Sequence, residues 1–407
     1  MDLAKKISGL VDEMQSTFIK YRRKLHRHPE LSGCEEETAA YVAAILEANG
    51  LDVERHVGGH GVVGVVRGEG SGKSIAIRAD MDALPLQDEK QSDYASEVKG
   101  VMHSCGHDAH TAILLGVATI LSRLRGEFKG DIKLIFQPSE EETPGGAGAM
   151  IDDGVLQDPT PSAILALHVM PELPVGTIGC RSGEMTAASD KVGITLYGRS
   201  GHAARPHQTI DAILVSSHVI SALQHIISRR IDPLHPAVIT IGTIRGGTVA
   251  NIVADKVEMT GTVRSLNSAI REQLPDLIQQ VIKGVTESMG AAYDFTFTKG
   301  NPSVVNNEKV TALVVECGRE ILGSDKVIDL KEPTMGGEDF SLFAERVPGS
   351  FFRLGVGNKK KGIIHPLHHS LFDIDEGALA VGVKVMVLAA LRLLKKKDGK
   401  KRDGKKQ

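Results

Sequence analysis

The sequence has no tryptophan and is poor in cysteine. Its four cysteines, Cys34, Cys105, Cys180 and Cys317, are scattered over 407 residues, which is not the density of a disulfide-stapled secreted domain. The first residues, MDLAKKISGLVDEM, lack the uninterrupted apolar core of a signal peptide. A run of about eighteen apolar residues that could span a bilayer is also missing. These absences predict a cytoplasmic protein without a membrane partner.

Positive charge is concentrated at the C-terminal end of a chain whose formal net charge is only −3. The last sixteen residues, RLLKKKDGKKRDGKKQ, contain nine lysines or arginines and two aspartates. A basic segment can bind nucleic acid or a membrane surface, but this one has no aromatic residue for base stacking and no apolar face. We therefore expect residues 395–407 to form a solvated, disordered tail, and we expect no nucleic-acid partner.

A chain of this length exceeds what one hydrophobic core normally organises, so two domains are expected. Short apolar runs typical of strands alternate with helical patterns in the first part of the chain. The runs lie at 62–66, 74–77, 132–136 and 163–167, with a helical pattern at 112–124. This alternation predicts an α/β domain with a mostly parallel sheet and helices on both faces.

The middle of the chain has a different pattern. Between residues 190 and 298 the predicted order is strand, helix, strand, strand, helix, strand, which is the order of a ferredoxin-like domain. The α/β character resumes after Pro302 and ends in a long apolar helix at 378–394. We therefore predict a discontinuous domain, 1–185 and 299–407, interrupted by a smaller domain at 186–298.

The segment RGEGSGKS at 67–74 resembles a phosphate-binding P-loop. However, Arg67 stands where the first required glycine would be, and the segment joins two predicted strands without opening a helix. We interpret it as the loop of a hairpin.

Three histidines, a cysteine and an aspartate occur within nine residues in MHSCGHDAH, 102–110. Cys105 and His107 are two residues apart, so their side chains lie on one side of an extended chain and can meet one ion. Thiolate and neutral imidazole are good ligands for Zn²⁺ and related divalent ions. By itself the segment is also compatible with chance among sixteen histidines, or with half of a structural zinc site.

Further ionisable residues follow other predicted strands. Asp80 and Asp82 come after SIAI, the acidic run of FQPSEEE comes after IKLIF, and His168 ends AILAL. Because ligands bind at the carboxyl ends of strands in open α/β sheets, we expect these side chains at one edge. The segment HPLHHSLFDIDE, 365–376, adds three more histidines late in the chain.

These ligands are more numerous than one tetrahedral structural zinc uses, and no HExxH motif is present. A pair of metal ions that activates water for hydrolysis fits the ligand count better. In such a site one carboxylate binds metal and a neighbouring one moves the proton. The pair Glu140 and Glu141 suits this division.

The combination of motifs resembles the dinuclear metallopeptidases related to aminoacylase and carboxypeptidase, in the branch of hippurate hydrolase, N-acyl-amino-acid amidohydrolases and auxin-conjugate hydrolases. The matching segments occur in order and span nearly the whole chain. They are RRKLHRHPELSGCE, IRADMDALP, MHSCGHDAHTAILLG, FQPSEEETPGGAGAMIDDGVL, ALHV, GRSGHAARPHQTIDAI, GGEDFSLF and HHSLFDIDE.

The resemblance implies a role for each matching residue. Cys105 would bridge two metal ions, Glu140 would be the general base and acid, and Asp82 would orient a group of the metal site. In LHHS, the register against Ser370 and Phe372 favours His369 over His368. The implied metal ligands are Cys105, His107, Glu141, His168 and His369.

The resemblance also makes the inserted domain a lid and dimerisation domain. His202 would reach an active site, often that of the partner subunit, and stabilise the developing oxyanion. Asn251 and Arg264 are candidates for gripping a substrate carboxylate. Gly336 and Gly337 would let backbone approach the substrate closely.

The function so implied is hydrolysis of the amide bond of N-acyl amino acids or short peptides with a free carboxylate, as in an amidohydrolase or carboxypeptidase. The cofactors would be two divalent ions, Zn²⁺ first, with Mn²⁺, Co²⁺ or Ni²⁺ as alternatives. A homodimer or homotetramer is expected. A different amide, such as a diaminopimelate or thiazolidine-type intermediate, is a further option. The alternative from another class is a non-catalytic protein that binds peptides or acyl-amino acids at a metal site.

Overall fold

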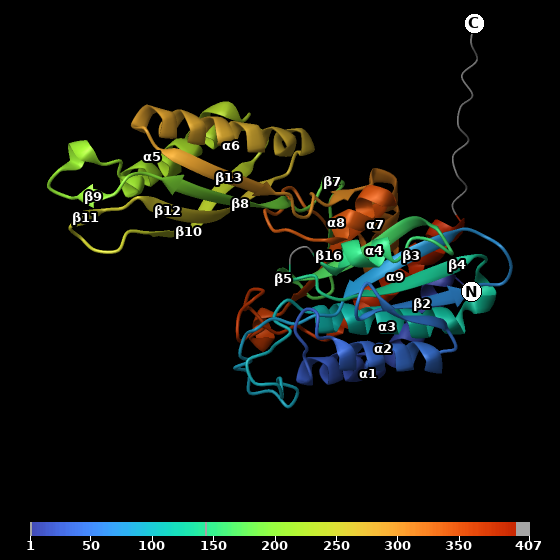
Figure 1. Cartoon of the computed structure of the whole chain (residues 1–407). Coiled ribbons are helices and arrows are strands. Elements are labelled where there is room, and N and C mark those ends of the chain that lie inside the picture. The colour runs from blue at the N-terminus through green and yellow to red at the C-terminus, as the bar shows by residue number, and fades with distance from the viewer. Residues whose placement is uncertain (1, 143–144, 396–407) are drawn as a thin grey trace, which may run out of the picture. The chain divides into compact units, whose positions relative to one another are not determined.

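The computed structural model describes residues 2–142 and 145–395 (Figure 1). The chain forms two compact units. The first unit comprises Met1–Gly183, Asn306–Lys331 and Phe343–Gln407, and the second comprises Glu184–Val305 and Glu332–Leu342. The predicted boundaries assigned 184–185, 299–305 and 332–342 to the larger domain, whereas the structure has them in the smaller unit. The segment 332–342 bonds to the backbone of that unit, for example from Ala187 N–H to Gly336 O at 2.9 Å. The predicted tail after residue 395 lies outside the described residues.

The first unit is built on an eight-stranded sheet with the order β1-β2-β4-β3-β5-β16-β6-β15. The central neighbours β4, β3, β5 and β16 run parallel, whereas β1 and β2 add antiparallel pairs at one side. This mostly parallel sheet confirms the predicted α/β class. The strands are β1 (Asp52–Val57), β2 (Gly61–Arg67), β3 (Ser74–Asp80), β4 (Asp131–Gln137), β5 (Pro161–Pro174), β6 (Ile178–Cys180), β15 (Val327–Asp329) and β16 (Gly349–Gly357).

Helices of the first unit enclose its core. α3 and α9 pack on the central strands and on each other, and α1 packs on both. The apolar stripe of α1, which includes Ile7, Val11 and Phe18, is fully buried in this contact. The helices are α1 (Leu3–Arg27), α2 (Glu36–Ala48), α3 (His107–Arg123), α4 (Gly146–Asp152), α7 (Glu308–Leu322) and α9 (Gly377–Lys395), while α8 (Phe340–Arg346) crosses the boundary between the units.

One described helix, α9, is long and apolar enough to cross a membrane by length and composition. The sequence analysis predicted a long apolar helix here but no membrane-spanning run, because Lys384 and Arg392 interrupt its apolar residues. Within the structure, 78% of its apolar window is buried, and Lys384 pairs with Asp12 of α1 at 2.7 Å. A core helix of a globular protein passes the same test.

The second unit has the element order β8-α5-β10-β12-α6-β13, with two short strands, β9 and β11, between them. Its sheet is antiparallel with the order β10-β12-β8-β13, and α5 and α6 pack against it. This is the β-α-β-β-α-β order that the sequence indicates. The elements are β8 (Ala188–Tyr197), β9 (Gly201–His202), α5 (Ala212–His225), β10 (Ala237–Gly246), β11 (Ile252–Val253), β12 (Lys256–Ser265), α6 (Ser268–Met289) and β13 (Ala292–Thr298); β7 (Gly183–Glu184) and β14 (Val305–Asn306) lie where the chain passes between the units.

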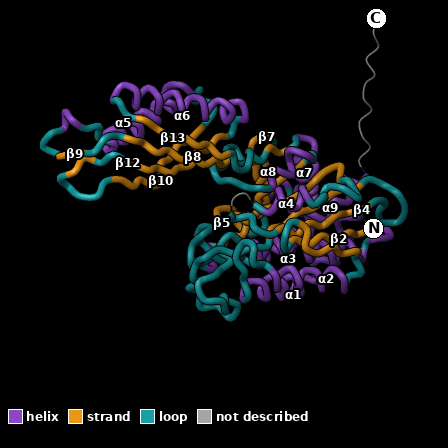
Figure 2. Tube along the Cα trace, viewed as in Figure 1, coloured by secondary structure: helices purple, strands orange, loops and turns teal. Residues whose placement is uncertain are grey.

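Two local expectations are wrong. The loop 68–73 is not a hairpin, because β2 and β3 both pair with β4, which lies between them. The sequence analysis also misses β16, a buried strand beside β5. Figure 2 shows loops gathered beside β5 in the first unit.

Candidate metal centre

A tight turn brings Cys105 and His107 together at the start of α3. Gly106 between them has a φ of 87°, in the left-handed region that favours glycine. A Cβ at this position would lie 2.4 Å from Cγ2 of Val169, so no larger residue fits. The chain can therefore turn directly into α3, whose first residue is His107.

Cys105, His107 and His168 form a buried cluster whose ligand atoms lie within 4.8 Å of one another. His168 Nε2 is 3.4 Å from Cys105 Sγ, while its Nδ1 is 2.7 Å from the carbonyl oxygen of Val169. That carbonyl can only accept, so the proton is assigned to Nδ1 and Nε2 keeps its lone pair. Burial lowers the pKa of His168 well below its usual value, which keeps the ring neutral. His168 is thus prepared as a ligand through Nε2.

His107 is oriented by Asp82, which is buried just beyond the end of β3. Asp82 Oδ1 lies 3.1 Å from His107 Nδ1. Its Oδ2 accepts hydrogen bonds from Ser32 Oγ at 2.6 Å and from the backbone N–H of Glu141 at 3.0 Å. Asp82 therefore fixes the ring of His107 and the backbone of Glu141, an arrangement typical of carboxylates behind metal-bound histidines.

Glu140 and Glu141 follow β4, and their ligand atoms lie within 4.8 Å of that of His107. Glu141 Oε1 is 3.8 Å from His107 Nε2 and 3.4 Å from His368 Nε2. Burial raises the pKa of Glu141, but the nearby His368, whose Nε2 is 3.4 Å away, and the charge of His107 outweigh this and lower it. The carboxylate is therefore ionised, as a ligand must be.

These residues fit divalent cations. Among the described residues, His107 Nε2 and Glu141 Oε1 are buried and have no hydrogen-bond partner, a costly state for two polar atoms unless something binds them. Burial lowers the pKa of His107, but the charges of Asp80 and Cys105 outweigh this and raise it well above the usual value. The surroundings of His107 therefore favour a positive charge at this position. Thiolate, imidazole and carboxylate are the donors that Zn²⁺ and related ions prefer.

The structure places His368, rather than His369, in this cluster. His368 forms a candidate ligand group with Cys105 and Glu141, and its backbone N–H donates to Ser104 O at 2.9 Å. Its φ of 62° is unusual for a residue other than glycine, and such backbone conformations concentrate at functional sites. His369 is in no candidate group of the described residues; its ring stacks on His365, and its Nδ1 accepts the N–H of Leu371. The register argument for His369 is therefore corrected to His368.

A second candidate group, Asp80, His107 and His110, has less free ligand capacity. His110 Nε2 accepts the backbone N–H of Val169 at 2.9 Å, so its proton is on Nδ1, which bonds to Asp80 at 2.6 Å. The other oxygen of Asp80 is 2.8 Å from Arg78 Nη1. His110 thus has no spare lone pair for a metal, and each oxygen of Asp80 already accepts one hydrogen bond.

The segment 30–35 was assigned no role in the sequence analysis. It makes hydrogen bonds that position the backbone next to Glu140 and Glu141. Ser32 binds Asp82 as described, and buried Glu35 accepts the backbone N–H of Ser139 at 2.7 Å. Ser139 has a φ of 54°, so this hydrogen bond stabilises an unfavourable turn directly before Glu140. The only sequence signal is that both residues lie in the matching segment RRKLHRHPELSGCE.

Replacing Ser32 by alanine should weaken metal binding about tenfold, because partners that orient metal ligands typically contribute 10–100-fold. Titration against a chromogenic chelator measures this affinity. Ser162→Ala is the control, since Ser162 Oγ donates to the carbonyl of Ser74 outside the centre. Equal affinities for both variants and the parent protein would show that Ser32 does not position Asp82.

A buried ionic network fixes the ends of two segments that carry ligands. Arg22 donates to Asp108 at 2.7 Å and to Asp373 at 2.9 Å, and His26 Nδ1 is 2.7 Å from Asp108. Asp108 belongs to the first turn of α3, and Asp373 follows the His368 segment. Sequence reasoning missed this function of α1, because the contacts join residues more than 80 positions apart.

The remaining predicted residues lie in the second unit, at two places. β9 pairs with β11, so His202 lies beside Asn251, and the carbonyl of Asn251 accepts the N–H of Ala203. Arg264 Nη1 donates to Met335 O at 3.1 Å, and a Cβ at Gly337 would lie 3.6 Å from that nitrogen. Gly336 precedes Gly337, so these glycines and Arg264 form the second group.

Figure 1 shows β9 and β11 together at one end of the second unit, whereas Arg264 is next to the last residue of β12. β12 begins at Lys256, three residues after β11 ends, and from Lys256 to Arg264 is eight residues of strand, or about 26 Å. Asn251 and Arg264 of one chain are thus kept apart along the strand, and their role in binding a substrate carboxylate stays a prediction.

The fold and the centre define the class of metal-dependent hydrolases, and comparisons with known proteins give the family. The model of peptidase family M20/M25/M40 matches residues 76–392. Thermostable carboxypeptidase 1 of Saccharolobus solfataricus is 40% identical over 399 residues, 97% of this chain and 100% of that protein. The N-acyl-L-amino acid amidohydrolase of Geobacillus stearothermophilus is 43% identical over 304 residues, 74% of this chain and 81% of that protein.

A solved structure supports the same family assignment. The crystal structure of the YXEP protein of Bacillus subtilis, a dinuclear metal binding peptidase from the M20 family, is 35% identical and has a TM-score of 0.83. The match covers 94% of this chain and 99% of that one. The chain belongs to peptidase family M20/M25/M40 and is a hydrolase of that family.

Proposed function

We propose that the protein hydrolyses the amide bond of N-acyl amino acids or short peptides that carry a free carboxylate. The observation that carries this proposal is the position of Glu140 beside the buried ligand atoms of His107 and Glu141, which have no hydrogen-bond partner among the described residues. Relatives named carboxypeptidase, N-acyl-L-amino acid amidohydrolase and N-acetyl-L-cysteine deacetylase support the substrate class.

Two divalent ions would be held by Cys105, His107, Glu141, His168 and His368. When bound, they supply Lewis acidity and lower the pKa of water. Glu140 takes the proton of the attacking water and returns it to the leaving amine nitrogen, so one carboxylate serves as base and then as acid. Asp82 acts through His107 and Glu141 as a positioning residue.

The second unit is proposed to act as lid and dimerisation domain. His202 and Asn251 at one end of its sheet would complete the site of a second chain, with His202 stabilising the oxyanion. Arg264, Gly336 and Gly337 at the other end would bind substrate in their own chain. The separation of these groups along β12 supports two distinct binding roles within the second unit. A homodimer or homotetramer is part of the same proposal.

The proposal is tested by release of free amino acid from N-acetyl-methionine, hippurate and dipeptides, with and without a chelator. Turnover of at least one substrate that stops on metal removal and returns on addition of Zn²⁺, Mn²⁺, Co²⁺ or Ni²⁺ is expected. Binding of these compounds without cleavage under every metal would overturn the proposal in favour of a binding protein.

A further inference from the structure

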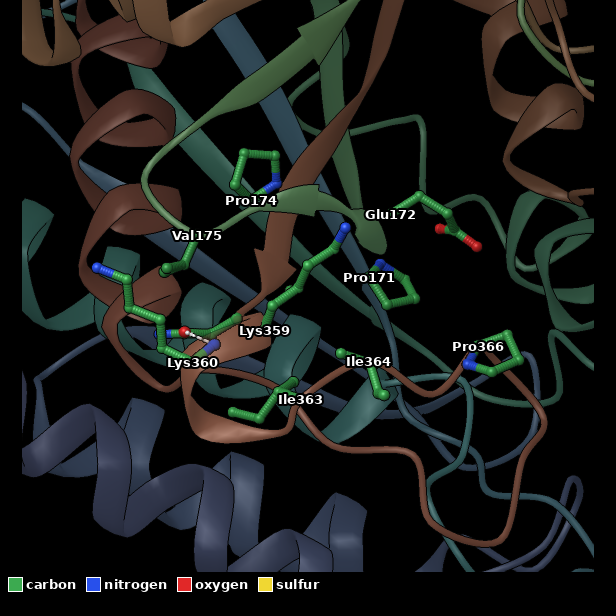
Figure 3. A pocket seen from close by; sticks show the side chains of 11 residues that line it. Pro171, Glu172, Pro174, Val175, Lys359, Lys360, Ile363, Ile364 and Pro366 are labelled. Atoms are coloured by element: carbon green, nitrogen blue, oxygen red, sulfur yellow. Dashed lines mark hydrogen bonds between the residues drawn. The ribbon is translucent and has the colours of Figure 1, made fainter.

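A cavity of about 650 Å³ lies in the first unit. Its walls come from the end of β5 and from the residues that follow β16 (Figure 3). Cavities of this size hold small-molecule groups in proteins. The apolar residues that line it are Pro171, Pro174, Val175, Ile363, Ile364 and Pro366.

Both walls lead to histidines of the metal centre. Pro171 is three residues beyond His168 on β5, and a strand rises about 3.3 Å per residue, so this wall begins about 10 Å from His168. On the other wall, only Leu367 separates Pro366 from His368. Both walls of the cavity are therefore close along the chain to histidines of the candidate centre.

The cavity is preformed by local hydrogen bonds. Asn358 and Ile363 exchange two backbone hydrogen bonds of 2.9 and 3.0 Å, and Asn358 Nδ2 donates to Asp375 at 2.6 Å. At Gly357 a Cβ would lie 2.1 Å from the carbonyl oxygen of Pro171, so the two walls approach closely there. Rigid walls reduce the entropy cost of ordering a bound ligand.

The cavity combines exposed apolar surface with positive charge. Ile364 is 60% exposed, which is unusual for so large an apolar side chain. Lys359 extends between the apolar walls in Figure 3, and neither it nor Lys360 has an acidic partner among the described residues. Glu172 is the one acidic residue of the lining. This surface suits an uncharged or anionic apolar group and disfavours a cationic one.

We propose that this cavity is the acyl subsite, and that it binds medium-length aliphatic or aromatic acyl groups of N-acyl amino acids. The inference rests on the proposed amidohydrolase function and adds the class of acyl group. Acyl groups that end in an ammonium bind less well, because Lys359 and Lys360 outnumber the one acidic residue of the lining, Glu172.

The test is kcat/KM of the full-length, metal-loaded protein for N-acetyl-, N-hexanoyl-, N-octanoyl- and N-(6-aminohexanoyl)-methionine. The kcat/KM for N-octanoyl-methionine should exceed that for N-acetyl-methionine by at least about tenfold, since each fully buried methylene raises binding roughly fourfold. The aminohexanoyl compound should fall about tenfold below hexanoyl, because its ammonium faces two lysines. Ile364→Ser should lower the octanoyl value about fourfold and leave the acetyl value within about twofold.

Val98→Ser is the matched control, because Val98 is an exposed apolar residue of the first unit outside the cavity. It should change neither value. A flat dependence on acyl length, or an equal loss for acetyl and octanoyl in Ile364→Ser, would overturn the subsite while leaving the amidohydrolase function intact.

If no acyl-methionine is cleaved, the proposed function fails and the cavity is tested by binding alone. Calorimetry then compares N-octanoyl- and N-acetyl-methionine on metal-loaded Glu140→Gln protein. Tighter binding of the octanoyl compound, reduced by Ile364→Ser, would support the cavity as an acyl site, and equal affinities would overturn it.

Discussion

Replacing Glu140 by glutamine should leave the metal content unchanged and lower kcat by about 10²–10⁴-fold, the usual contribution of a general base. Glutamine keeps the size and polarity of the side chain but cannot accept the proton of the attacking water. Elemental analysis measures the metal, and release of amino acid from a cleaved acyl-amino acid measures kcat.

Glu142→Gln provides the matched control, because Glu142 belongs to the same acidic run but is exposed and in no candidate ligand group of the described residues. It should retain turnover within about twofold, since exposed substitutions away from a site have small effects. Near-normal turnover in metal-loaded Glu140→Gln protein would refute the assignment of the base.

Replacing His368 by alanine should weaken binding of one of the two metal ions by more than about 100-fold. Residues that only orient a metal ligand typically contribute 10–100-fold to metal affinity, and the ligand itself contributes more. His369→Ala should retain both ions, because the ring of His369 stacks on His365 and its Nδ1 is already occupied by the N–H of Leu371. Metal stoichiometry after dialysis, measured by elemental analysis, separates the two variants.

The opposite result, with loss of metal in His369→Ala and full metal in His368→Ala, would restore the register inferred from the sequence. Equal loss in both variants would mean that the segment collapses as a whole. Near-ultraviolet circular dichroism of each variant tests that, since a collapsed segment would alter the spectrum of the aromatic residues around it.

Local sequence predicted most of the centre because metal ligands are recognised by residue type and short spacing. Only Gly106 separates Cys105 from His107, and Glu140 and Glu141 are adjacent in the sequence. Pairing these residues therefore required no information from distant parts of the chain. Parallel strands then bring their carboxyl ends to one edge, which placed His168 and Asp82 with them.

The errors arose where a contact depends on distant parts of the chain. β16 escaped the sequence analysis because its run SFFRLGVG is interrupted by the charged Arg353, which the structure buries opposite His168 of β5. The hairpin prediction failed for a similar reason, because β4, more than 60 residues later, inserts between β2 and β3. The choice between His368 and His369 depended on a backbone bond to Ser104 that sequence register does not contain.

The sequence by itself determined the class of chemistry, because thiol, imidazole and carboxylate groups at strand ends carry their affinity for divalent cations wherever the chain places them. Only the tertiary structure decided which groups are ligands and which are supports. Two histidines adjacent in sequence can face opposite ways, and a serine or glutamate 50 to 104 residues away can hold the turn that aims a ligand. Such selection results from burial and hydrogen-bond geometry, which are properties of the folded chain.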